Sequence, residues 1–338
     1  MWRWLGFPLL LLFLCWCLGP LCTTLVLVVP ALVWLALGGR RRTEPPVDPR
    51  GRAVFITGCD TGFGNLLARR LHGLGFSVFA ACLFPEGPGA LELQTATKET
   101  GGAGELHLVK LDVCSDSDVA QAKQLVQSRL PEKGLWALVN NAGISAWGET
   151  EWLPIEKYKQ VADVNLLGSI RTTLAFLPLI RKSKGRIVFM SSTNAFMTAK
   201  NGIYCMTKAA IEKFCDSLRL DMKRFAVQVS IIEPGNYSQV TNIQLQKPAE
   251  AIWNGLSEEM KEIYSKEYVK ELTDFVNAKL REGSDKAHEV IDAIVEALTS
   301  ATPRARYMVA TVKEKILVFI FNICPTSWLD ALLSLQFK

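Results

Sequence analysis

From Ala53 onward, short apolar runs alternate with longer stretches of helical periodicity, and this order restricts the possible folds more than any other feature of the chain. The apolar runs predict strands at residues 53–57, 76–83, 106–113, 135–139, 186–190 and 227–232. The stretches between them predict helices at residues 65–74, 116–130, 155–181 and 205–225. Strands separated by helices form βαβ units, in which helices cover both faces of a parallel sheet. The sequence therefore predicts an α/β fold with a doubly wound parallel sheet.

Residues 4–39 form the longest apolar run of the chain and contain no charged side chain and no His. A helix needs about 20 apolar residues to cross a bilayer, so this run is long enough to do so. Pro20 and Pro30 interrupt it, which leaves a single kinked span and a re-entrant hairpin as alternatives. A cleaved signal peptide is a further alternative, but the apolar run continues far beyond the core of such a peptide. We therefore predict an anchor in contact with membrane lipid.

This run also sets the predicted domain boundaries. Residues 1–42 form the membrane anchor, residues 43–50 a Pro-rich linker, and residues 51–338 the folded domain. The anchor ends in three Arg, at positions 40–42. Because positive residues next to a span stay on the cytoplasmic or matrix side, we expect the folded domain on that side. This orientation is compatible with the membrane of the endoplasmic reticulum and with the mitochondrial inner membrane.

The charge balance excludes a nucleic-acid partner. The chain carries 38 Lys and Arg against 33 Asp and Glu, and five of the Arg lie in residues 1–50. The rest of the chain is nearly neutral, which is unlike a protein that neutralises phosphate backbones. The nine Cys and three His form no metal-ligand spacing and no disulfide framework, so we expect free thiols, a reducing compartment and no metal site.

A glycine-rich segment, Thr57–Gly64, lies between the first predicted strand and its helix. Glycines at such a junction let the chain turn and let backbone N–H groups approach a pyrophosphate at the start of the helix. A tight strand-to-helix turn without a ligand is the alternative. The predicted cofactor-binding residues of this segment are Gly58, Asp60, Gly62, Phe63 and Gly64.

Tyr204 and Lys208 lie four residues apart in a predicted helix, so their side chains share one helix face. A free Tyr, with a pKa of about 10, is a poor base at neutral pH. A nearby ammonium group favours the phenolate and lowers the pKa of the phenol. Such a phenol can act as a general base. An ordinary surface pair is the alternative.

These motifs occur in one order along the chain. The glycine spacing is G-x-x-x-G-x-G, Asn140–Gly143 follows the fourth strand, a Ser pair follows the fifth, and Tyr204-x-x-x-Lys208 comes next. With these motifs, residues 51–245 resemble the short-chain dehydrogenase/reductase family. The resemblance implies a Rossmann-type fold and hydride transfer between a nicotinamide cofactor and an alcohol or carbonyl.

The resemblance also implies catalytic roles. Tyr204 is the general acid and base, and Lys208 lowers its pKa and holds the cofactor ribose. The family's Ser, which hydrogen-bonds the reacting oxygen, is Ser191 when counted back from the Tyr and Ser192 when the strand is aligned. Side chains alternate along a strand, so only one of the two faces the site, and we choose Ser192 because loops absorb deletions more easily than strands. Asn165 matches the family's helix Asn, which supports a proton path to the Lys; a hydrogen-bonded core Asn is the alternative.

Further cofactor contacts follow from the same resemblance. Asp112 matches the family's adenine contact, although a helix cap is an alternative for this residue. Asn141, Ala142 and Gly143 belong to the motif after the fourth strand. Pro234 and Gly235 match the motif beside the nicotinamide, and Thr241 reaches its carboxamide. The expected cofactor is NAD rather than NADP, because Asp60 would repel a 2′-phosphate and no Lys or Arg follows the second strand.

Within the family, the chain most resembles the membrane-associated branch that acts on 3-hydroxybutyrate, hydroxysteroids or retinol. Segments that carry this resemblance include Ile56–Gly64, Gly134–Val139 and Glu233–Asn236. The implied substrate is a small hydroxy acid, D-3-hydroxybutyrate. Its buried carboxylate would need a cationic or hydrogen-bonding partner, and the loop before Tyr204 offers Lys200; a solvated loop lysine is the alternative. A steroid or a retinoid is the alternative, for which Trp147 and Trp152 could flank a flat ring system. A non-catalytic nucleotide-sensing scaffold is the alternative of another class, and the complete Ser, Tyr and Lys set argues against it.

The C-terminal part, from about residue 236 to residue 338, is predicted to form a substrate lid. Residues 247–272 predict a pair of charged helices, and residues 284–300 a further amphipathic helix. Two apolar segments, residues 316–324 and 328–337, are too short to span a bilayer. A dimer interface, the membrane surface and core packing remain alternatives for them. We expect a homo-oligomer.

Overall fold

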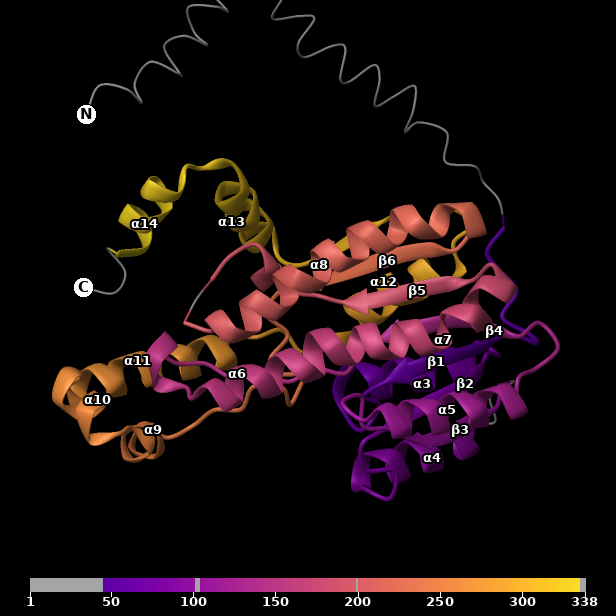
Figure 1. Ribbon diagram of the computed structural model, residues 1–338, viewed down its shortest axis with the longest axis horizontal. Coiled ribbons are helices and arrows are strands. Elements are labelled where there is room, and N and C mark those ends of the chain that lie inside the picture. Colours follow the sequence, from indigo (N-terminus) through magenta and orange to yellow (C-terminus); the bar gives the residue numbers. More distant parts are fainter. Residues whose placement is uncertain (1–44, 101–103, 199, 335–338) are drawn as a thin grey trace, which may run out of the picture. The chain divides into compact units, whose positions relative to one another are not determined.

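Seven parallel strands form the centre of the computed structural model, which describes residues 45–100, 104–198 and 200–334 (Figure 1). Their order across the sheet is β3-β2-β1-β4-β5-β6-β7. The strands are β1 (Ala53–Thr57), β2 (Ser77–Cys82), β3 (Leu106–Lys110), β4 (Leu135–Asn140), β5 (Arg186–Met190), β6 (Gln228–Pro234) and β7 (Arg306–Val309). The predicted doubly wound parallel sheet is confirmed, and the strand order reverses between β1 and β4.

The six predicted strands are present, and their nearly continuous apolar sequences follow from burial on both faces. Every residue of β1, β2, β4 and β5 is buried. The third strand ends at Lys110, earlier than predicted, because residues 111–113 already lead to the next helix. The seventh strand, Arg306–Val309, was not predicted, since it is short and begins with a charged residue.

Helices cover both faces of the sheet (Figure 1). One apolar core lies under α3 (Gly62–Gly73), α4 (Pro88–Thr100) and α12 (Ala287–Thr299). The other lies under α5 (Asp116–Ser128), α7 (Ser169–Ser183) and α8 (Gly202–Met222). Helix α4 was not predicted from the sequence. The described chain from Val47 onward belongs to one compact unit.

The helix predicted over residues 155–181 is not regular throughout. It consists of α6 (Ile155–Ala162), a π-helical turn (Asp163–Gly168) and α7. Two close contacts occur in the π-helical turn. The side chain of Asn165 bonds to the backbone of Ile144, and Gly168 approaches Val113 so closely that a Cβ would lie 2.7 Å from Cγ2 of that residue. Such turns are frequent at functional sites.

The predicted lid segment contains three helices rather than the predicted pair, and these helices lie beyond the end of the sheet toward which the strands point (Figure 1). They are α9 (Ala249–Gly255), α10 (Glu258–Ile263) and α11 (Lys266–Arg281). Ser257 and Ser265 cap α10 and α11, which explains why the chain restarts a helix twice. The lid packs on Trp147 and Trp152 through an apolar cluster that includes Leu272.

Helices α13 (Val312–Ile323) and α14 (Thr326–Ser334) follow β7. Val318 of α13 is buried, but Ile316, Phe319 and Trp328 are more than half exposed. Core packing therefore accounts for only a small part of this apolar surface. The predicted membrane anchor, residues 1–42, lies outside the described residues. Within the described ranges, no helix combines the length and the apolar character that crossing a membrane requires.

Candidate active site

The predicted motifs meet at the carboxyl ends of the four central strands. The glycine loop follows β1, Asn141–Gly143 follows β4, Ser191 and Ser192 follow β5, and Gly235 follows β6. The strand order reverses between β1 and β4, and open parallel sheets bind their ligands at such a reversal. The topology thus assembles one site from motifs that are far apart in the sequence.

Tyr204 and Lys208 lie on the face of α8 that packs toward the sheet, and both are buried. The ammonium nitrogen of Lys208 lies 5.4 Å from the centre of the Tyr204 ring. It donates a hydrogen bond of 2.7 Å to the carbonyl oxygen of Met190, the last residue of β5. Gly143 is also close, since a Cβ at this position would lie 3.8 Å from Nζ of Lys208.

The two Ser after β5 have different surroundings. The hydroxyl of Ser192 donates a hydrogen bond of 3.4 Å to the carbonyl oxygen of Pro234 and lies near enough to the Tyr204 phenol to lower its pKa. It also accepts a bond from the backbone N–H of Asn194. The hydroxyl of Ser191 is buried without a hydrogen-bond partner in the part of the chain that the structure describes. The geometry therefore favours Ser192 for the role that the resemblance implies.

The ionisation of the Tyr and Lys pair differs from the expectation. Burial raises the pKa of Tyr204, and the hydroxyl of Ser192 opposes this only in part. Burial likewise lowers the pKa of Lys208 to about 8, and the nearby Glu212 carboxylate opposes that shift. Desolvation disfavours both charged forms, so in the protein alone it outweighs the effect of the ammonium on the phenol.

Asn165 uses its whole side chain in hydrogen bonds. Its Oδ1 accepts from the N–H of Ile144 at 2.8 Å, and its Nδ2 donates to the carbonyl oxygen of Ile144 at 2.9 Å. Nδ2 also donates to the hydroxyl of Thr207 at 3.1 Å. Thr207 in turn donates to the carbonyl oxygen of Tyr204. Asn165 therefore joins the loop after β4 to the helix that carries the candidate base.

The glycine loop is held against the loop after β4. The hydroxyl of Thr57 accepts hydrogen bonds of 3.0 Å from the N–H groups of Asn141 and Ala142. Gly58 has φ of 70°, and a Cβ there would lie 2.8 Å from Cα of Ala142, so a side chain would separate the two loops. Thr57 was not predicted as a site residue, although its place at the end of β1 directly before Gly58 could have indicated it.

The N-terminus of α3 is suited to an anion. Its N-cap residue, Thr61, makes no capping hydrogen bond with its side chain, and its first turn has no acidic residue. By contrast, α5, α10 and α11 each have a capping Ser and acidic residues in the first turn. The first N–H groups of α3 are therefore not satisfied by a capping side chain, which fits a pyrophosphate group.

Asp60 reaches the end of the neighbouring strand. Its carboxylate accepts hydrogen bonds from the N–H groups of Leu83 at 3.0 Å and Phe84 at 2.9 Å, directly after β2. In dinucleotide-binding folds an acidic group at this end of the second strand meets the ribose hydroxyls. The donors and acceptors present thus fit a dinucleotide without a 2′-phosphate.

Three further predicted cofactor residues have different surroundings. Asp112 follows β3 and accepts a hydrogen bond from the N–H of Cys114, so it also acts within its own turn. Thr241 lies beside Gly62, where a Cβ would be 3.7 Å from Cα of Thr241. Thr241 is therefore close to the glycine loop. Gly235 faces α13, since a Cβ there would lie 2.5 Å from a carboxylate oxygen of Glu314.

Lys200, the predicted partner of a substrate carboxylate, is engaged with a protein carboxylate. Its ammonium nitrogen lies 2.6 Å from Oε1 of Glu149, and both side chains are mostly buried. The hydroxyl of Tyr268, on lid helix α11, donates to the same Glu149 oxygen. Neither Glu149 nor Tyr268 was predicted, because nothing in their local sequence distinguishes them from surface residues.

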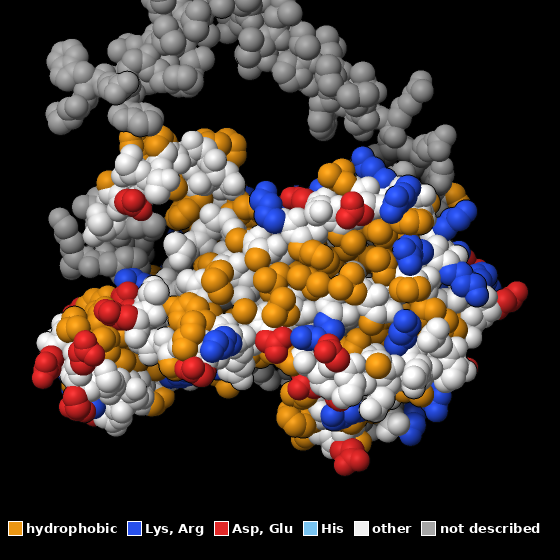
Figure 2. Space-filling model, viewed as in Figure 1, with side chains coloured by type: hydrophobic (Ala, Val, Ile, Leu, Met, Phe, Trp, Pro, Cys, Tyr) orange, Lys and Arg blue, Asp and Glu red, His pale blue; other side chains and the backbone are white. Residues whose placement is uncertain are grey.

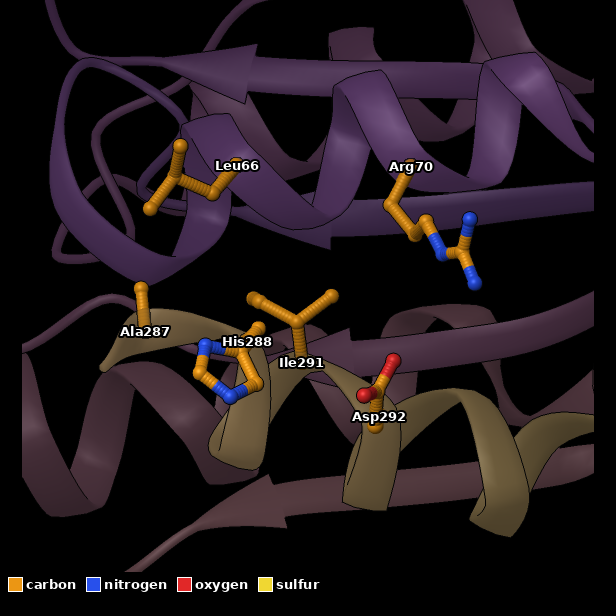
Figure 3. Close-up of a pocket in the computed structure, with 6 residues that line it drawn as sticks. All are labelled: Leu66, Arg70, Ala287, His288, Ile291 and Asp292. Carbon is orange, nitrogen blue, oxygen red and sulfur yellow. The ribbon is translucent and has the colours of Figure 1, made fainter.

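A separate hollow of about 410 Å³ lies between α3 and α12 (Figure 3). Leu66 and Arg70 come from α3, and His288, Ile291 and Asp292 come from α12. None of the motif residues lines it, so it is not the candidate active site.

Comparisons with known proteins agree with this geometry. The short chain dehydrogenase family matches residues 52–250. The mitochondrial D-beta-hydroxybutyrate dehydrogenase of Bos taurus is 42% identical over 280 residues, which cover 80% of each chain. Retinol dehydrogenase 7 of Mus musculus is 39% identical over 311 residues, 91% of this chain and 96% of that protein.

Solved structures share the fold at lower identity. A short-chain dehydrogenase from Streptomyces avermitilis has a TM-score of 0.62 at 21% identity and covers 84% of this chain and 94% of its own. A short chain dehydrogenase/reductase from Burkholderia phymatum, in complex with NAD, has a TM-score of 0.63 at 19% identity, with 81% and 94% covered.

Proposed function

Because this chain belongs to the short-chain dehydrogenase family, we propose that it is an NAD-dependent oxidoreductase that interconverts a secondary alcohol and a ketone. The observation that carries the proposal is the buried group of Ser192, Tyr204 and Lys208 at the carboxyl end of β5. A non-catalytic scaffold would not need to bury an ammonium group and a phenol together, because burial opposes the charged form of each.

In the proposed reaction, Tyr204 accepts the hydroxyl proton of the alcohol and Ser192 orients the same oxygen by a hydrogen bond. Bound NAD supplies the hydride acceptor and a positively charged ring. Lys208 adds a second positive charge near the phenol, and its bond to Met190 keeps the ammonium in place. Asn165 supports the proton path by holding the loop after β4 and α8 together.

Tyr204→Phe tests the assignment, since it retains the packing of the ring and removes only the hydroxyl. Turnover should fall by roughly 10²–10⁴-fold, as is typical when an acid–base group is removed. Tyr158→Phe is a matched control, because the Tyr158 hydroxyl bonds to the carbonyl of Thr150 outside the site. Near-normal turnover by a folded Tyr204→Phe enzyme would exclude Tyr204 as the base.

The proposed substrate is D-3-hydroxybutyrate, which would be oxidised to acetoacetate. The identity to D-beta-hydroxybutyrate dehydrogenase supports it, as does the polar segment after Gly235, where Gln244 accepts a hydrogen bond from Ser145. Lys200 can still contact a substrate carboxylate, because an ammonium group has three donors.

Retinol or a hydroxysteroid is the second candidate, and one observation favours it. Glu149 neutralises Lys200, so a carboxylate at this position would meet no net positive charge. Trp152, Tyr264 and Tyr268 also form an aromatic cluster that would suit a large apolar substrate. The similarity to retinol dehydrogenase 7 supports this alternative.

A substrate panel separates the candidates. NADH formation by the purified full-length protein should be measured in parallel with D-3-hydroxybutyrate, retinol, estradiol and a glucocorticoid. Turnover of hydroxybutyrate alone would support the first proposal, and turnover of retinol or a steroid without hydroxybutyrate would support the second. A protein that binds NADH but produces none with any alcohol would support the nucleotide-sensing scaffold.

The proposed location is a membrane of the mitochondrion or the endoplasmic reticulum. The uncharged run of residues 4–39 and the following Arg support an anchor at residues 1–42 and a linker at residues 43–50, with the catalytic domain on the matrix or cytoplasmic side. One relative, D-beta-hydroxybutyrate dehydrogenase, is named as mitochondrial, whereas the name of retinol dehydrogenase 7 gives no compartment. Both membranes therefore remain alternatives.

A homo-oligomer is the proposed assembly. An apolar area extends over α7 and α8 on the face shown in Figure 2. Leu174 and Met206 are 61% and 48% exposed there, and Leu167, in the preceding π-helical turn, is 49% exposed. Contiguous exposed apolar surface of this kind usually marks a protein contact. The proposed occupant is the same face of a second copy.

A further inference from the structure

A buried carboxylate lies next to the candidate proton-transfer pair on α8. Tyr204, Lys208 and Glu212 follow one another at intervals of four residues, so they lie on one face of the helix. All three are buried, and Glu212 is only 3% exposed. A carboxylate is rarely buried to this extent unless a positive charge compensates it.

Arg306 of β7 contacts this carboxylate and joins it to two others. Its Nη1 donates to Glu212 and, at 2.8 Å, to Glu233. Its Nη2 donates to both oxygens of Asp216 at 2.9 and 3.0 Å. Glu233 is 1% exposed and lies on β6 directly before Pro234. One guanidinium therefore links the catalytic helix to the strand that ends at the predicted nicotinamide motif.

The acids in this cluster exceed the positive charge that Arg306 supplies. Asp216 has a second cation in Arg219 at 2.7 Å, and the exposed Lys213 lies 3.9 Å away. Glu212 and Glu233 share one guanidinium. The Oε1 atom of Glu212 is buried and has no hydrogen-bond partner among the described residues. Its charge is therefore only partly compensated by Arg306.

We propose that Glu212 is a positioning residue of the proton-transfer site, whose buried carboxylate supports the charge of Lys208 and is itself held by Arg306 beside Glu233. The proposal rests on the roles that the proposed function gives to Tyr204 and Lys208. In this proposal, the cluster of Glu212, Arg306 and Glu233 favours the protonated form of Lys208, which burial disfavours.

The ionisation of the surrounding groups agrees with this. Burial lowers the pKa of Lys208 to about 8, and the carboxylate of Glu212 opposes this shift, whereas burial keeps the neighbouring Cys215 thiol uncharged by raising its pKa. The pKa of Glu233 is raised by burial and further by the charge of Glu212, although Arg306 opposes this. On the other side of Lys208, burial raises the pKa of Tyr204, so a positive charge beside the phenol is needed to favour its deprotonated form.

The test is the pH profile of kcat/KM for the full-length enzyme with NAD and the alcohol that the wild type oxidises in the panel above. Glu212→Gln retains the shape and removes the charge, so Lys208 should lose its proton at lower pH. The alkaline limb should move down by roughly one pH unit, which makes kcat/KM several-fold lower near pH 9 while the value near pH 6.5 changes little.

Asp221→Asn is the matched control, because it removes a carboxylate from an exposed position of the same helix, and Asp221 is not among the groups that shift the pKa of Lys208. Its alkaline limb should coincide with that of the wild type. If Glu212→Gln is poorly folded, Glu233→Gln provides the second test. Without the Glu233 carboxylate, Arg306 neutralises Glu212 more fully. The alkaline limb of the kcat/KM profile should therefore again move to lower pH. Glu212→Asp, which restores a carboxylate, should recover part of the shift.

A Glu212→Gln profile that is lowered equally at all pH values would overturn the proposal and leave Glu212 with a structural role. A profile that coincides with the wild type would overturn it as well. Lys208→Met separates these results from a failure of the proposed function. If that variant keeps its turnover, the role assigned to Lys208 is wrong, whatever Glu212 does.

Discussion

At the residue scale, burial determines which side chains can act in this site. Ser191 and Ser192 are adjacent and both are buried, but of the two only Ser192 lowers the pKa of the Tyr204 phenol. Consecutive side chains of an extended segment point to opposite sides. The side chain of Ser192 therefore points toward the phenol, and that of Ser191 points away from it. Two residues of identical chemistry thus differ completely in what they can do.

Ser192→Ala should therefore lower kcat/KM by roughly 10²-fold, because it removes a hydrogen bond to the reacting oxygen. Ser191→Ala should have a mild effect on turnover, since it removes a buried hydroxyl that lacks a hydrogen-bond partner among the described residues. Steady-state kinetics on both variants, with thermal unfolding as a check on folding, gives the answer. The reverse order of effects would mean that Ser191 is the family's Ser.

The pair of Lys200 and Glu149 supports a prediction about substrate class. If Lys200 binds the substrate carboxylate, Lys200→Ala should raise KM for D-3-hydroxybutyrate roughly tenfold or more, while Glu149→Gln should lower it by releasing the ammonium group. Neither change should affect KM for retinol in this way. Kinetics on both substrate classes measures the difference, and Glu151→Gln is a control, since Glu151 bonds to Tyr264 of the lid instead. Equal effects of both changes on KM would argue that the pair only holds the lid.

At the element scale, the turn from β1 to α3 shows how local chemistry selects a cofactor. Glycines allow the loop to approach the chain after β4, and an uncapped helix start leaves N–H donors for an anion. The carboxylate of Asp60 then crosses to the end of β2 and bonds to two N–H groups there. A negative charge at this point disfavours a 2′-phosphate.

We therefore expect kcat/KM to be higher with NAD than with NADP. Asp60→Asn should reduce the ratio of the two values roughly tenfold, which corresponds to about 1.4 kcal/mol of lost repulsion. Glu86→Gln is the control, because Glu86 lies in the loop after β2, beyond the two residues whose N–H groups bond to Asp60. A wild-type enzyme that prefers NADP would contradict the cofactor assignment.

At the scale of the whole molecule, the described chain folds as one unit from Val47 onward, so the catalytic domain and the predicted anchor should be separable. Deletion of residues 1–42 should leave NAD-dependent turnover intact and abolish resistance to alkaline extraction from membranes. Fractionation of cells that express the full-length and truncated proteins checks this. A truncated protein that remains fully integral would assign the anchoring to the apolar surface of α13 and α14.

Local sequence was enough to predict six of the seven strands and the glycine loop. It also predicted that the side chains of Tyr204 and Lys208 lie on the same face of a helix. Each of these depends on short-range patterns, because apolar runs become buried strands and a spacing of four places two side chains on one helix face. The π-helical turn at Asn165 and the third lid helix were not predicted, since both depend on contacts or caps that periodicity does not report.

The amino-acid sequence by itself determined the order of the motifs and the chemistry that each can supply. Only the tertiary structure decided which side chains meet: Thr57 with the loop after β4, Lys200 with Glu149, and Arg306 with Glu212 and Glu233. These partners are separated by 51 to 94 residues along the chain. Their contacts arise because parallel strands bring distant segments to one edge of the sheet, and the energy of a buried charge depends on neighbours that a local pattern does not contain.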